Sequence, residues 1–154
     1  MFDKVFEAFA VGQTWRSPRG RTVTEADIVN FCGLSGDFYP LHSDAVWAEH
    51  GPFGRRIAHG LLVLSLTSGL VRLEPGYVWA FYGIDSLRFV APVYIGDTLW
   101  ADLRVTETTA KDDRFGVVAV EAKAVNQRDE VVMVGTWRLA VPRRAPIGSA
   151  PPSS

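Results

Sequence analysis

The feature that most limits the fold of this chain is the segment of residues 60–73, which is apolar on nearly every side of the helix it predicts. Its large apolar side chains are Leu61, Leu62, Val63, Leu64, Leu66, Leu70 and Val71. A helix that is apolar all round is buried rather than laid on a surface. The charge-free run that contains it, residues 57–71, would span roughly 22 Å as a helix, and a hydrocarbon core is about 30 Å thick. The sequence therefore predicts a helix inside a protein core and no membrane contact.

The second half of the chain predicts long strands. Residues 115–125 and 131–141 are rich in β-branched side chains, with a turn at residues 126–129 between them. Residues 77–91 form a further extended run with a bend at Gly83. A period of two appears in Leu99, Ala101, Leu103 and Val105. Short links imply antiparallel neighbours, so the predicted fold class is α+β, an antiparallel sheet wrapped around one long central buried helix.

Two shorter helices are expected before the central one. Thr24 followed by Asp27 has the pattern of a helix N-cap, and Gly36 is placed to end that helix. A second helix is expected to begin at residues 43–44 and to stop at residues 51–52, which are Gly and Pro.

Composition limits the number of domains and the classes of protein that remain possible. The chain has 154 residues, a formal net charge of −1 and 47% hydrophobic residues, which predicts one domain over residues 1–141. Residues 142–154 hold four of the nine prolines and are expected to form a flexible tail. The charge excludes a basic nucleic-acid binder, and a single cysteine excludes a disulfide framework. The N-terminus carries acidic residues where a signal peptide needs an apolar run, so a cytoplasmic location is expected.

Asp37 and His42 are the candidate acid–base pair. Gly36 permits a turn before them, and Pro40 forces Tyr39 into extended geometry. A rigid loop of this kind presents both side chains to one cavity. A carboxylate and an imidazole can hold opposite protonation states near neutral pH and move a proton between water and carbon. The alternative is that Asp37 only caps a turn and His42 lies on the surface.

The central helix offers further candidates. Gly60 lies where the helix is expected to begin, so its unpaired N–H can hold an oxygen that gains negative charge. The alternative is that Gly60 only permits close packing. Ser65 and Ser68 share one helical face and either border a polar site or donate back to carbonyls one turn earlier.

The sequence contains no motif typical of a metal site or a cofactor site. His42, His50 and His59 do not have the spacing of metal ligands, and Cys32 has no second cysteine to join it. His59 is expected to be a structural histidine bonded to backbone, and Cys32 a core residue. Phosphate loops and dinucleotide fingerprints are also missing. We therefore expect neither a metal nor a cofactor.

The two segments around these residues resemble the MaoC-like dehydratase family, which includes the (R)-specific enoyl-CoA hydratases. The matching stretches are residues 35–44, 57–61 and 68–70, with weaker support from residues 89–93 and 96–97. The resemblance covers about residues 10–141. It implies a hot-dog fold, in which an antiparallel sheet wraps a central helix, and a homodimer or higher oligomer with its site near a subunit interface.

The same resemblance implies roles for individual residues. Asp37 and His42 match the catalytic pair, Gly60 the amide that binds the thioester carbonyl, and Ser68 a supporting serine. Tyr39 stands where many members have Asn. The implied substrate is an acyl-CoA thioester, and the implied activity is reversible hydration of a trans-2-enoyl-CoA to an (R)-3-hydroxyacyl-CoA, a reaction of fatty acid metabolism. The alternatives are a hot-dog thioesterase and a hot-dog subunit that binds acyl-CoA or a partner without catalysis.

Overall fold

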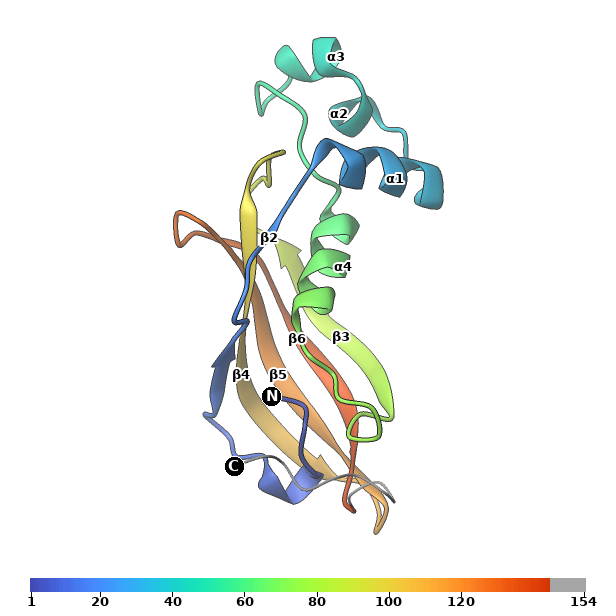
Figure 1. Ribbon diagram of the computed structural model, residues 1–154, viewed down its shortest axis with the longest axis vertical. Coiled ribbons are helices and arrows are strands. Elements are labelled where there is room, and N and C mark those ends of the chain that lie inside the picture. Colours follow the sequence, from blue (N-terminus) through green and yellow to red (C-terminus); the bar gives the residue numbers. More distant parts are fainter. Residues whose placement is uncertain (145–154) are drawn as a thin grey trace.

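The computed structural model describes residues 1–144, which form one antiparallel sheet with a central helix and a group of short helices (Figure 1). The sheet has six strands in the order β1-β4-β5-β6-β3, with β2 also paired to β4. The strands are β1 (Thr14–Arg16), β2 (Arg21–Thr22), β3 (Ala80–Phe89), β4 (Thr98–Ala110), β5 (Phe115–Asn126) and β6 (Val131–Pro142). The helices are η1 (Phe6–Ala8), α1 (Glu25–Ser35), α2 (Pro40–Ser43), α3 (Ala45–Glu49) and α4 (Gly60–Leu70).

The long strands follow the expected pattern. In β4 the side chains from Leu99 to Val105 alternate between buried and less buried, because successive residues of a strand point to opposite faces. β5 and β6 pair along almost their whole lengths, from Phe115 opposite Pro142 to Val125 opposite Val131. The buried face of these strands packs against α4 and α1 in a single hydrophobic core. The predicted α+β sheet around a central helix is confirmed.

The expectation that the central helix is buried on every side is wrong for this single chain. Leu62, Val63 and Thr67 are buried against the sheet, but Leu61 is 58% exposed and Ser65 and Gly69 are exposed with it. These three positions recur every four residues and form one stripe along α4. The apolar pattern did predict a helix, but it could not predict which face the sheet would cover.

The central helix also ends earlier than expected. It stops at Leu70, because Val71 is extended and the chain then turns to meet the N-terminal segment, where Phe2 bridges Leu73. Phe2 and Val71 are both buried where the extended chain replaces the expected last turn of the helix. Helix continuation to residue 73 would remove that bridge.

The two short helices that the sequence predicts, α1 and α3, are capped as expected, whereas α2 was not predicted and has no side-chain cap. Thr24 and Asp27 form a reciprocal capping box at the start of α1, and Gly36 ends it in the left-handed conformation with φ of 77°. Asp44 caps α3 by accepting a hydrogen bond from the Trp47 amide at 3.0 Å. The three helices α1, α2 and α3 lie together beyond the end of the sheet at which α4 begins (Figure 1).

Several elements were not predicted. β1 and β2 are two or three residues long and mostly exposed, so they carry no period of their own and exist because they pair with β4. β6 extends to Pro142, and the amide of Arg143 donates to the Arg114 carbonyl, so the ordered chain runs slightly past the predicted domain end. The rest of the predicted tail, residues 145–154, lies outside the described residues. Within residues 1–144 we find no helix with the length and apolarity needed to cross a membrane.

Candidate active site

Asp37 is held by local hydrogen bonds in the loop that follows α1. Its amide donates to Ser35 Oγ at 3.1 Å, and Ser35 Oγ itself donates to the Phe31 carbonyl at 2.6 Å. One carboxylate oxygen, Oδ1, accepts the amide of Tyr39 at 3.1 Å, which is an Asx-turn. Tyr39 is extended (φ −54°, ψ 132°) before Pro40, as the sequence predicts. One carboxylate oxygen is therefore committed to the loop, and the other accepts no hydrogen bond from the part of the chain that the structure describes.

His42 lies in α2 and is oriented by the backbone of a distant segment. Its Nδ1 is 2.8 Å from the carbonyl oxygen of Ile57. A carbonyl only accepts, so Nδ1 carries the proton of the neutral imidazole and Nε2 is left as an acceptor. The Ile57 amide donates to the Leu41 carbonyl at 3.3 Å, which ties the two segments together. The fold thus presents His42 with Nε2 as its reactive nitrogen.

His59 is the third member of the cluster. It is 2% exposed, and its Nε2 donates to the backbone carbonyl of Asp37 at 3.0 Å. This confirms the expectation of a structural histidine bonded to backbone. The sequence did not predict that its ring stacks on His42, with centroids 3.8 Å apart and an interplanar angle of 28°. Within residues 1–144 its buried Nδ1 has no hydrogen-bond partner.

Burial sets the charge of His59. Removal from water lowers the pKa of this imidazole below its ordinary value of 6.5, and the charge of His42 acts in the same direction. The hydrogen bond to the Asp37 carbonyl and the Asp37 carboxylate oppose the change without overcoming it. His59 is therefore neutral near neutral pH.

The three side chains converge. One ligand-type atom each of Asp37, His42 and His59 lie within 4.8 Å of one another. Two acceptors that share one water at hydrogen-bond distance are about 4.6 Å apart, given bonds of about 2.8 Å and a tetrahedral angle. Coordination of a metal by all three residues is less suited to this arrangement, because His42 Nδ1 and His59 Nε2 already bond to backbone carbonyls and His59 Nδ1 is buried. The geometry fits a bound water better.

Gly60 is the first residue of α4, as expected. A Cβ built on it would lie 2.5 Å from Cε2 of Phe89, so the ring of Phe89 occupies the space that any side chain would need. Close packing is thus one reason for glycine here. The N–H groups of the first helical turn have no partner inside the helix, and no acceptor in residues 1–144 takes the Gly60 amide. Both readings of Gly60 left open by the sequence are compatible with this geometry.

The serines of the central helix bond within the helix. Ser65 Oγ donates to the Leu61 carbonyl and Ser68 Oγ to the Ser65 carbonyl, each at 2.8 Å. Ser68 is two turns from Gly60, a rise of about 12 Å. The structure therefore brings Asp37, His42 and His59 together, and it does not bring Ser68 into contact with them within the described chain.

Exposed aromatic side chains flank the cluster. The ring of Tyr39 lies edge-on to His42 at a centroid distance of 6.4 Å and to Trp47 at 5.7 Å. Tyr39 is 54% exposed and Trp47 43%. Trp47 had no role in the sequence analysis, because only the turn between α2 and α3 brings it beside Tyr39. Both rings form an apolar border beside His42.

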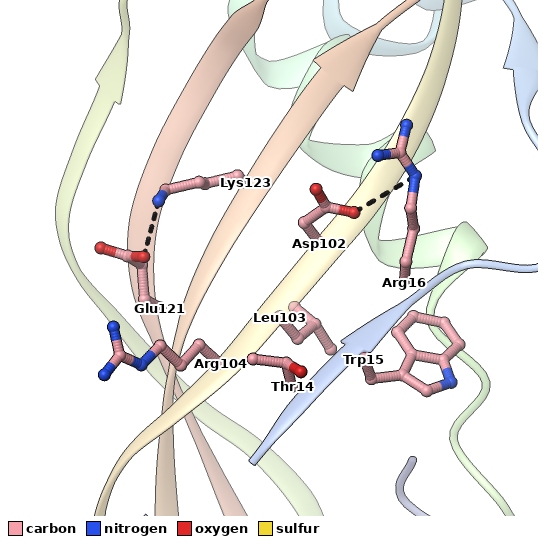
Figure 2. Close-up of a pocket in the computed structure, with 8 residues that line it drawn as sticks. All are labelled: Thr14, Trp15, Arg16, Asp102, Leu103, Arg104, Glu121 and Lys123. Carbon is pink, nitrogen blue, oxygen red and sulfur yellow. Dashed lines mark ion pairs between the residues drawn. The ribbon is translucent and has the colours of Figure 1, made fainter. Parts of the chain in front are cut away.

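A second charged region lies on the outer face of the sheet, opposite α4. A hollow of about 480 Å³ is lined by side chains of β1, β4 and β5. Figure 2 shows two ion pairs in it, between Arg16 and Asp102 at 3.5 Å and between Lys123 and Glu121 at 2.8 Å. Both carboxylates that line this hollow, Asp102 and Glu121, face a cationic partner in it. Neither is therefore a free acid–base group comparable to the Asp37 cluster within residues 1–144.

Comparison with known proteins assigns the family. Residues 6–127 match the MaoC like domain. The chain is 37% identical over 142 residues to the Protein MaoC of Klebsiella aerogenes, covering 91% of this chain and 39% of that protein. It is 38% identical over 111 residues to an (R)-specific enoyl-CoA hydratase of Aeromonas caviae, covering 65% of this chain and 82% of the relative.

Solved structures agree on the fold. A structure from Archaeoglobus, described as a monoamine oxidase regulatory protein, matches with a TM-score of 0.86 and 37% identity, covering 92% of this chain and 95% of that one. The antiparallel sheet around α4 is a hot-dog fold. The chain belongs to the MaoC-like dehydratase family, whose members include hydratases and dehydratases. It spans about two fifths of the length of the Klebsiella protein, 39%.

Proposed function

We propose that this protein catalyses the reversible addition of water to a trans-2-enoyl-CoA, giving an (R)-3-hydroxyacyl-CoA. The observation that carries the proposal is the convergence of the Asp37 carboxylate and the His42 imidazole within 4.8 Å, with His42 Nδ1 committed to the Ile57 carbonyl. The (R) configuration and the enoyl-CoA substrate are supported by the named activity of the Aeromonas relative.

The two groups act on one water. With Nδ1 of His42 donating to the Ile57 carbonyl, the imidazole that carries one proton has Nε2 as an acceptor. A water between Nε2 and an Asp37 carboxylate oxygen then donates both of its hydrogens and turns a lone pair outward. Asp37 takes one proton as the water oxygen attacks C3 of the enoyl group. The proton returns to C2 with the help of His42. One O–H bond breaks, C3–O and C2–H bonds form, and the C2=C3 double bond becomes single.

Negative charge develops on the thioester oxygen as C3 is attacked. We propose that the amide of Gly60, at the positive end of the α4 dipole, receives that oxygen; the support is its position as the first residue of α4. A single donor of this kind contributes about 3 kcal/mol to lowering a barrier. Ser68 is proposed to border the same substrate two turns further along α4.

A second copy of the chain is proposed to cover the stripe Leu61, Ser65 and Gly69. β3 is the last strand of the sheet order and has β6 as its neighbour within the described residues. Its large apolar side chains Phe81 and Tyr82 are 39% and 64% exposed. An exposed edge strand and an exposed helical stripe are each suited to self-association. Sedimentation equilibrium tests this, and a monomer at micromolar concentration would contradict it.

The proposed reaction is tested with purified protein, crotonyl-CoA and a longer 2-enoyl-CoA. The expected result is loss of the enoyl absorbance and formation of the (R)-3-hydroxyacyl-CoA, identified by chiral analysis. Release of free CoA thiol without a hydroxyacyl product would identify a thioesterase instead. Binding of the thioesters without turnover would identify a non-catalytic subunit. Either of these two outcomes overturns the proposal.

A further inference from the structure

His59 makes separate contacts with each part of the candidate site. Its Nε2–H donates to the backbone carbonyl of Asp37 at 3.0 Å. Its ring stacks on His42 at 3.8 Å. It is also the residue before Gly60, and its own carbonyl accepts the amide of Val63 at 3.0 Å in the first turn of α4. One buried side chain therefore connects the acid, the base and the helix start.

Two side chains of α1 also contact the His59 ring. The ring of Phe31 in α1 lies 4.9 Å from it, centroid to centroid. Cys32 Sγ, also in α1, is 3.7 Å from His59 Nε2. His59 is 2% exposed and Cys32 3%, so neither side chain has room to rotate freely. The imidazole of His59 is packed between α1 and the loop that carries Asp37.

The charge state of His59 suits this place. The titratable groups that face it are Asp37, His42 and Cys32. A neutral His59 lets the stacked His42 accept a proton without repulsion between two cations at 3.8 Å. Its unpartnered Nδ1 also cannot serve as a donor to substrate while Nε2 carries the proton.

We propose that His59 is the positioning residue of the acid–base pair, which holds the Asp37 backbone and the His42 ring at the separation of one shared water without touching the substrate. This inference rests on the proposed hydration for its kinetic test. Its structural content, the orientation of His42, is measured without substrate.

Two variants separate the two contacts of His59. His59→Gln keeps an N–H near the position of Nε2 but removes the stacked ring. His59→Phe keeps a ring for the stack but removes the donor to Asp37. His50→Gln is the matched control, because His50 is an exposed histidine whose Nδ1 bonds to the Val46 carbonyl of its own helix at 2.9 Å.

The kinetic test compares kcat and KM for crotonyl-CoA, with a thermal melt for each protein. We expect kcat to fall about 10- to 100-fold in both His59 variants, as a misplacement of about 1 Å does, with KM changed less than about threefold. The His50 variant keeps both constants. Should His59→Phe fail to fold, the Gln variant decides alone. Unchanged kcat in a folded His59 variant overturns the proposal.

The substrate-free test is ¹⁵N NMR of the histidine rings. We expect wild-type His42 in its neutral form to be protonated at Nδ1, and His59→Gln to show a smaller fraction of that tautomer, because without the stacked ring His42 no longer stays aligned with the Ile57 carbonyl. His59→Phe keeps the stack and should stay closer to wild type. An unchanged His42 tautomer in His59→Gln overturns the positioning role. If the wild type shows no hydration but the tautomer does shift, the proposed function fails and the positioning role stands.

Discussion

Two charged regions of this molecule differ in what binds their polar groups. In the hollow on the outer sheet face, side chains pair with side chains, as Lys123 does with Glu121 at 2.8 Å, and both remain more than one third exposed. In the cluster of Asp37, His42 and His59, each residue has a bond to backbone, which leaves reactive atoms unpaired. Exposed ion pairs contribute little to stability. Backbone anchoring instead fixes a group and keeps its chemistry available.

The largest expected difference between the two regions is in activity. Asp37→Asn removes the carboxylate that takes the water proton, so we expect kcat to fall about 10²- to 10⁴-fold. The melting temperature should change little, because Asn keeps an oxygen that accepts the Tyr39 amide. Glu121→Gln in the outer hollow is the control, with kcat expected within about twofold. An active Asp37→Asn enzyme would contradict the assignment of the base.

The next largest effect concerns the helix start. Gly60→Ala places a Cβ 2.5 Å from the Phe89 ring, and forced overpacking costs about 1–3 kcal/mol. Turnover should fall as well, because the amide of residue 60 moves with the displaced helix. Gly33→Ala is the control: a Cβ at Gly33 in α1 meets nothing within 4 Å, so we expect stabilisation of about 0.5–1 kcal/mol. Urea denaturation measures both.

The pH dependence of stability tests the burial of His59. Its pKa is lowered in the folded protein by burial, from 6.5. Below about pH 6.5 the unfolded chain binds a proton that the folded protein does not, so the free energy of unfolding should fall as pH falls. Urea denaturation at about pH 7.5 and about pH 5.5 should show a smaller decrease in His59→Gln than in wild type. An equal decrease would mean that other groups set the slope.

The smallest effect is expected in the outer hollow. Lys123→Gln removes one member of an ion pair whose side chains are 36% and 39% exposed. We expect the free energy of unfolding to change by less than about 0.5 kcal/mol, and this small difference from wild type to shrink as salt is added, because salt screens exposed charges. A loss of several kcal/mol would show that this hollow, and not only the Asp37 cluster, depends on its charges.

Much of the fold follows from local patterns. The period of two in β4, the β-branched runs of β5 and β6, and the capping box at Thr24 all act over a few residues, so each is visible in the sequence. β1 and β2 are set by pairing with β4, and the uncovered stripe of α4 by which of its faces packs on the sheet. Tertiary contacts decide these, and no short pattern encodes them.

The candidate site also combines residues that local patterns indicate with a contact that only the tertiary structure makes. Asp37 follows α1 and His42 lies in α2, and their closeness in sequence with Gly36 and Pro40 made them a candidate pair, beside the alternative that Asp37 only caps a turn. The stacked residues His59 and His42 lie in separate segments of the chain. The hydrogen bond from the Ile57 amide to the Leu41 carbonyl brings these two segments together. The only sequence feature that pointed to His59 was its position directly before Gly60. That position is equally typical of a residue that only precedes a helix.

The most direct test of the central claim is hydration of crotonyl-CoA in H₂¹⁸O with mass spectrometry of the products. The account predicts one ¹⁸O in the hydroxyl group at C3 of an intact 3-hydroxyacyl-CoA, because the water held by Asp37 and His42 attacks that carbon. Appearance of ¹⁸O in a free carboxylic acid, with CoA released, would show that the water attacks the thioester carbonyl and would contradict the account.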